Sequence, residues 1–171
     1  MKFSTTTITK MALFIAISVV LSRFLSFKMI FMGIEGVRIG FGSFTIILSG
    51  ILFGPVSGAI VGALADIIGY MISPLGPYMP HFTLNAALVG FIPGLFLYNS
   101  YKRSHDLSIF LLLVVIGVEE IITTVVLLPY FLHTLFNIPL KAILPAYIIR
   151  AILDTIVFSL IIKALMRREI L

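Results

Sequence analysis

The fold of this chain is decided by residues Val37–Leu95, which read VRIGFGSFTIILSGILFGPVSGAIVGALADIIGYMISPLGPYMPHFTLNAALVGFIPGL. Three apolar runs in this stretch are separated by breaks rich in glycine and proline. The stretch also contains Arg38, Asp66 and His81. An unpaired charge inside hydrocarbon costs at least about 2.5–3.5 kcal/mol. Charged groups in such apolar surroundings therefore indicate a partner or a function.

The composition of the whole chain indicates a membrane protein. Its 171 residues are 60% hydrophobic and 11% charged, and the mean hydropathy is +1.20. A water-soluble domain of this size would expose large apolar patches at such a composition. Apolar runs of about 18 residues are long enough for a helix to cross roughly 30 Å of hydrocarbon. We therefore predict an all-α, polytopic membrane protein in which residues 1–171 form a single transmembrane domain.

The apolar runs predict six transmembrane helices. Their expected ranges are Thr5–Leu25, Phe41–Phe53, Val56–Ile72, Phe82–Tyr98, Leu107–Leu132 and Leu140–Leu165. Six spans place both termini on one side of the membrane. Seven lysines and arginines then lie on the side of the termini and four on the other side, so the positive-inside rule favours cytoplasmic termini.

The long outer connection and the small residues spaced four apart each suggest a role. Ser26–Gly40 is the longest outer segment, and its glycines suit either an ordinary flexible loop or a lid over the outer mouth. Small residues four apart, as at Gly58 and Gly62, allow helices to pack closely within the bundle. Ala12 and Ala16 have the same spacing near the start of the first helix, where we expect them to face a partner protein.

Polar residues gather at the middle and outer depths of the predicted bundle. Asp66 lies near mid-membrane without a cation on its own helix, and Tyr70 follows one turn later on the same face. Arg150 and Asp154 have the spacing of an ion pair within one helix, which is the alternative to a role in ligand binding. Because the inner half is nearly all apolar, we expect a ligand pocket open to the outside.

The candidate ligand-binding residues are assigned by depth and chemistry. Tyr78 and Phe82 would form an aromatic wall near Asp66, although both also suit the membrane interface. Adjacent residues on a helix point about 100° apart, so at most one of Glu119 and Glu120 should face the pocket. The full set of predicted ligand-binding residues is Arg38, Asp66, Tyr70, Tyr78, Phe82, Asn85, Glu120 and Arg150.

Sequence motifs for common chemistries are missing from the chain. There is no phosphate-binding Gly-x-x-x-x-Gly-Lys loop, no His-Glu-x-x-His metal motif and no Gly-x-Ser-x-Gly nucleophile elbow. We therefore expect no catalytic residues, no metal site and no cofactor. If the protein transports, its energy must come from a partner.

The run VRIGFGSFTIILSGILFGPVSGAIVGALADIIGY and the following FTLNAALVGFIPGL resemble the substrate-binding S component of energy-coupling factor (ECF) vitamin transporters, most closely the folate-specific branch. The segment Ala12-Leu-Phe-Ile-Ala16 matches the Ala-x-x-x-Ala signature of that family. The resemblance implies a vitamin-binding protein in the cytoplasmic membrane of a prokaryote. It further implies docking through the first helix on a shared transmembrane subunit driven by two cytoplasmic ATPases.

Folate capture is accordingly the leading functional hypothesis. Pyridoxine, hydroxymethylpyrimidine and pantothenate remain open as ligands within the same family. Two hypotheses belong to other classes, a small intramembrane enzyme that uses Asp66 or the Glu119–Glu120 pair as acid or base, and a stand-alone proton-coupled carrier. Turnover of a lipid-like substrate would favour the enzyme, and transport in vesicles without an ATPase would favour the carrier.

Overall fold

The structure is a computed structural model that describes residues 4–24, 26–31, 34–74 and 78–167. For residues 24, 26–31 and 34–39 the description covers the backbone alone. The described chain forms six helical spans and one β-hairpin. The helical spans are α1 (Thr5–Phe24), α2 (Gly42–Phe53), α3 (Pro55–Ile72), α4 (Pro80–Ser104), the continuous α5–η1–α6 segment (Ile109–Phe136) and α7 (Leu140–Arg167).

Most of these helices have the length and apolar character of membrane spans. Four of them meet both criteria, namely Thr5–Arg23, Pro55–Ile72, Pro80–Ser104 and Ile109–Phe136. With 28 residues, α7 extends about 42 Å at 1.5 Å per residue. The shorter α2 is buried at every position from Thr45 to Ile51. A helix surrounded by protein does not need to match the thickness of the bilayer, which accounts for its length.

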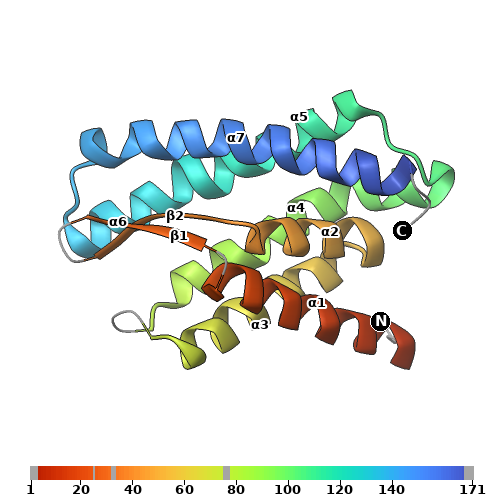
Figure 1. Cartoon of the computed structure of the whole chain (residues 1–171), viewed down its shortest axis with the longest axis horizontal. Helices are drawn as coiled ribbons and strands as arrows, with labels where there is room; N and C mark the ends of the chain where they lie inside the picture. The colour runs from red at the N-terminus through yellow and green to blue at the C-terminus, as the bar shows by residue number, and fades with distance from the viewer. Residues whose placement is uncertain (1–3, 25, 32–33, 75–77, 168–171) are drawn as a thin grey trace.

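The helices are arranged in two halves that lie side by side (Figure 1). Helices α1 to α4 form one half, and α7 packs along α5 and η1 in the other. Helix α1 begins and α7 finishes at the same end of the bundle (Figure 1), as an even number of crossings requires. Each of the six predicted spans corresponds to one observed helical segment.

Glycines bring α2, α3 and α4 into backbone contact. A Cβ atom on Gly90 would lie 2.9 Å from Cα of Gly58 and nearer still to its carbonyl group, and a Cβ on Gly58 would lie 2.7 Å from Cα of Gly50. No side chain fits at these three positions without separating the helices. A Cβ on Gly62 would likewise meet the backbone of Ala86. The prediction that Gly58 and Gly62 serve packing within the chain is confirmed.

The segment between α1 and α2 differs from the predicted loop. It forms an antiparallel hairpin of β1 (Ser26–Phe31) and β2 (Ile34–Gly40), in which Lys28 pairs with Arg38 along the backbone. Charged and apolar residues alternate around both positions, as Phe27-Lys28-Met29 and Val37-Arg38-Ile39, and this period of two is typical of strands. Of the two alternatives for this segment, the ordinary flexible loop is therefore wrong, and the lid stays a prediction.

Two helical ranges also differ from the prediction. Helix α4 continues past its predicted end at Tyr98 to Ser104, and its C-cap His105 has the left-handed conformation, so the connection to the next span is shorter than expected. Residues Ile121–Leu127 form a π-helical segment, η1, just before Pro129. The ring of a proline clashes with the carbonyl four residues earlier in a regular α-helix. The wider π turn accommodates this proline without breaking the span.

Candidate functional site

A cavity of about 310 Å³, called the main cavity below, lies among α1, α2, α3, α4, η1, α6 and α7. It is lined by the last turns of α1, α3 and α6 and by the first turns of α2, α4 and α7. These turns lie at the end of the bundle opposite to the one at which α1 begins and α7 finishes. The cavity has the size of a site for a small molecule.

Asp66 on α3 forms the acidic part of the cavity wall. Its Oδ2 accepts a hydrogen bond of 2.7 Å from Oγ1 of Thr83, and the hydroxyl groups of Thr83 and Tyr78 also lie 2.7 Å apart. The three side chains therefore form a continuous hydrogen-bonded series from the segment before α4 to α3. Asp66 has a polar partner, although its own helix supplies no cation.

Aromatic rings cover the wall next to this carboxylate. The rings of Tyr70 and Tyr78 have centroids 5.3 Å apart, and the rings of Phe82 and Phe131 lie edge to face at 6.3 Å. Nearby, Asn85 is 6% exposed, and its Oδ1 has no hydrogen-bond partner among the residues that the structure describes. A flat ligand with hydrogen-bond donors on its edge would find both a stacking surface and acceptors here.

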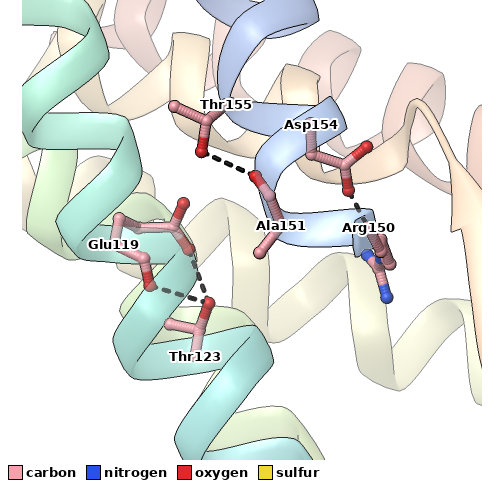
Figure 2. A network of polar contacts seen from close by, with 6 residues as sticks. All are labelled: Glu119, Thr123, Arg150, Ala151, Asp154 and Thr155. Carbon is pink, nitrogen blue, oxygen red and sulfur yellow. Dashed lines mark hydrogen bonds and ion pairs between the residues drawn. The ribbon is translucent and has the colours of Figure 1, made fainter. Parts of the chain in front are cut away.

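The cavity lining also includes Arg150, in the first half of α7. Its Nε donates to Oδ2 of Asp154 at 3.1 Å, and both side chains are 10% exposed. In Figure 2 the guanidinium group extends away from the adjacent helix that bears Glu119. The ion pair within α7, one of the alternatives considered for Arg150, is therefore present. The same arginine side chain also lines the cavity.

Two glutamates lie behind the cavity lining rather than in it. Glu119 is fully buried and receives a hydrogen bond of 2.8 Å from Thr123 on the same span (Figure 2), and Glu120 is 2% exposed. Oε2 of each has no hydrogen-bond partner in the described part of the chain. Neither glutamate lines the main cavity. Both carboxyl groups lie in the core between neighbouring helices.

Comparisons with known proteins agree with this architecture. The chain matches the family described as "ECF-type riboflavin transporter, S component" over residues 2–168. The chain belongs to this family of ECF S components. It is also 33% identical over 150 residues to "Folate transporter FolT" of Clostridium novyi (strain NT), covering 88% of this chain and 80% of that protein. A solved structure, "Crystal structure of FolT bound with folic acid", matches with a TM-score of 0.82 and 26% identity over 96% of this chain and 95% of the other.

The S component brings together most of the residues predicted to bind a ligand. Six of them line the main cavity, namely Asp66, Tyr70, Tyr78, Phe82, Asn85 and Arg150. Glu120 does not line it, because its position on the helix points it into the protein core. The side chain of Arg38 lies outside the described residues.

Sequence reasoning missed several residues of the S component cavity. Ser18, Ser22 and Arg23 at the end of α1 belong to its lining, and so do Thr124 of η1 and Tyr147 of α7. Nη1 of Arg23 donates to the carbonyl of Ser73 at 3.1 Å. A Cβ on Gly69 would lie 2.8 Å from Nε of Arg23, so a glycine lets this side chain lie across α3. In the sequence, Arg23 is a basic residue at the end of an apolar run. Such a position indicated only the orientation of the helix in the membrane.

The predicted docking residues Ala12 and Ala16 both lie on an exposed part of α1. Ala12 borders a wholly apolar groove between α1 and α3, together with Met11 and Ile60. The groove is separate from the main cavity and shares no lining residue with it. No group of three or more histidine, cysteine, aspartate or glutamate side chains suited to a metal ion occurs within the described ranges.

Proposed function

We propose that this S component binds folate in the main cavity and delivers it to an ECF-type importer. The observation that carries the proposal is the pairing, in one cavity, of an acidic and aromatic wall at Asp66, Tyr70 and Tyr78 with a basic wall at Arg150. The similarity to a folate transporter and to a folic acid-bound structure supports it. The cavity chemistry supports it independently of those names.

A pterin ring suits the acidic and aromatic wall. Its edge presents an amino group and a ring N–H side by side, which match the carboxylate of Asp66 and the unpartnered Oδ1 of Asn85. Its flat face suits the tyrosine pair, whose rings are tilted by 58°. Asp66 therefore recognises the ring rather than the tail.

The glutamate tail of folate carries two carboxylates and needs cations. Arg150 and Arg23 both line the cavity, and a guanidinium group binds a carboxylate with paired hydrogen bonds. Arg38, one of the ligand-binding residues predicted from the sequence, belongs to the hairpin strand β2, which packs against α7. Two guanidinium groups in the cavity lining favour a dianionic ligand over a neutral one.

This distinction separates folate from riboflavin, the vitamin in the description of the family. Riboflavin also has a flat ring, but its ribityl chain carries hydroxyl groups and no carboxylate. An arginine-lined wall gains little from such a chain, because neutral hydrogen bonds are weaker than charge-assisted ones. The basic wall is the reason for proposing folate within a family named for riboflavin.

The proposed importer needs partner proteins. The chain lacks a phosphate-binding loop, so a shared transmembrane subunit and two cytoplasmic ATPases would supply the energy. Ala12 and Ala16 offer an exposed small-residue face to such a subunit. With cytoplasmic termini, as the loop charges predict, the main cavity opens to the outside of the prokaryotic cytoplasmic membrane.

Titration calorimetry on the purified protein in detergent tests the proposed ligand. Wild type should bind folic acid tightly, a tail-less pterin less tightly and riboflavin weakly. Removing one partner of a desolvated, charge-assisted pair costs about 2–5 kcal/mol, so Asp66→Asn should weaken folic acid binding by roughly 30-fold or more. Riboflavin binding more tightly than folic acid would refute the proposal. Folic acid binding unchanged in Asp66→Asn would make that carboxylate structural.

A further inference from the structure

Thr83 occupies an unusual place next to the main cavity. It does not line the cavity, yet its hydroxyl group lies 2.7 Å both from Oδ2 of Asp66 and from the hydroxyl of Tyr78, which do line it. Thr83 therefore joins two cavity residues that belong to different segments, one in the second half of α3 and one ahead of α4.

The chemistry of these groups sets the direction of the two hydrogen bonds. Thr83 has a single hydroxyl proton, and it donates this proton to Asp66. The bond between Thr83 and Tyr78 must then use the proton of Tyr78. Tyr78 thus donates to Thr83, and Thr83 donates to Asp66. Tyr78 thus strengthens the hydrogen bond from Thr83 to Asp66, because hydrogen bonds in series polarise one another.

We infer that Thr83 is a positioning residue, which orients the carboxylate of Asp66 toward ligand donors and ties Tyr78 to the same wall. The inference rests on the proposed function for the identity of the ligand alone. Because Thr83 engages Oδ2, the inference assigns Oδ1 to the donors of the ligand. A ligand that offers donors at this point is selected over one that offers an acceptor.

The position of Tyr78 gives the second half of this arrangement. Tyr78 is 42% exposed, and its ring packs on Tyr70 at 5.3 Å. It precedes α4, whose N-terminal cap, Met79, forms no side-chain hydrogen bond. Its hydroxyl group therefore makes a specific polar contact with the first turn of α4 through Thr83. Loss of this contact should speed ligand release more than it slows capture.

The variants Thr83→Val, Thr83→Ser and Tyr78→Phe separate these roles. Valine keeps the shape of threonine without its hydroxyl group, serine keeps the hydroxyl group, and phenylalanine keeps the ring contact with Tyr70. Binding of folic acid should fall by about tenfold or more in Thr83→Val and stay near wild type in Thr83→Ser. Tyr78→Phe should raise the dissociation rate with little change in the association rate.

A matched ligand tests whether Thr83 acts through Asp66. In the analogue of folic acid with an oxygen in place of the 2-amino group, a donor facing Asp66 is lost. Wild type should bind this analogue more weakly than folic acid, and Thr83→Val should narrow the difference. An undiminished preference for folic acid in Thr83→Val would overturn the positioning role, and so would equal losses in Thr83→Val and Thr83→Ser.

A measurement without ligand separates this inference from the proposed function. The infrared difference spectrum between wild type and Asp66→Asn isolates the carboxylate bands of Asp66. Those bands should shift in Thr83→Val and remain in place in Thr83→Ser. If wild type failed to bind folic acid but the bands shifted, the ligand would be wrong and the positioning role would stand. Unshifted bands in Thr83→Val would refute the positioning role whatever the ligand.

Discussion

Nε of Arg150 lies 3.1 Å from Oδ2 of Asp154, one helical turn further along α7, and each side chain is 10% exposed. Two opposite charges withdrawn from water depend on one another, because either one alone would be left uncompensated. The remaining N–H groups of the guanidinium are available to the main cavity that Arg150 lines. The same arginine thus belongs both to the packing of α7 and to the basic wall.

This relationship predicts a large asymmetry between single and double substitutions. Arg150→Met leaves Asp154 buried without its cation and should cost roughly 3–5 kcal/mol of stability. The double variant Arg150→Met/Asp154→Leu should recover most of that loss, since it leaves no buried charge unpaired. Thermal unfolding of the ligand-free protein in one detergent measures both. Equal Tm values for the single and double variants would show that the charge of Asp154 does not depend on Arg150.

The contact between Gly58 and Gly90 predicts a position that tolerates no side chain. The Cβ added by Gly90→Ala would lie 2.9 Å from Cα of Gly58, against backbone that cannot turn aside. Overpacking of this kind costs about 1–3 kcal/mol, so the Tm should fall. Gly117→Ala is the control, because its Cβ would meet only Cγ2 of Thr155 at 3.6 Å. Alanine favours a helix more than glycine does, so the Tm of Gly117→Ala should stay the same or rise. A similar fall of Tm in both variants would count against close backbone packing as the cause.

The exposed face of Ala12 and Ala16 predicts a defect confined to transport. Ala12→Trp or Ala16→Trp should abolish folate uptake in cells, because a bulky ring prevents close approach of a partner helix. The purified variants should still bind folic acid, since the groove at Ala12 is separate from the main cavity. Leu13→Trp is the matched control, at a position that is 58% exposed and about 100° away around α1. Loss of uptake and binding together would indicate a folding role instead.

The hairpin between α1 and α2 predicts a change in backbone protection when ligand binds. Strand β1 packs on α1 and β2 on α7, and these helices supply Arg23 and Arg150 to the main cavity. Hydrogen exchange of the strand amides in β1 and β2 should therefore slow on addition of folic acid, and exchange at the far end of α7 should not change. An unaltered pattern in the hairpin with ligand bound would remove the lid hypothesis.

The positions of the spans were predictable from the sequence for a simple physical reason. A helix in hydrocarbon needs an apolar run of a certain length, and this requirement is local. The range Val56–Ile72 predicted for the third span agrees with Pro55–Ile72 in the structure. The same argument places Asp66 near mid-membrane, and this depth stays a prediction. The hairpin was missed because its alternating pattern is short and contains several glycines.

By itself, the sequence determined that the chain crosses the membrane in helices, where those helices lie and which of them carry polar groups. The tertiary structure alone decided which polar groups meet in one cavity. Depth follows from position along a helix, but the direction of a side chain depends on the rotation of the helix against its neighbours. The glycine contacts of α2, α3 and α4 and the π turn of η1 set this rotation. In the structure, Arg23 and Thr124 line the cavity and Glu120 lies in the core.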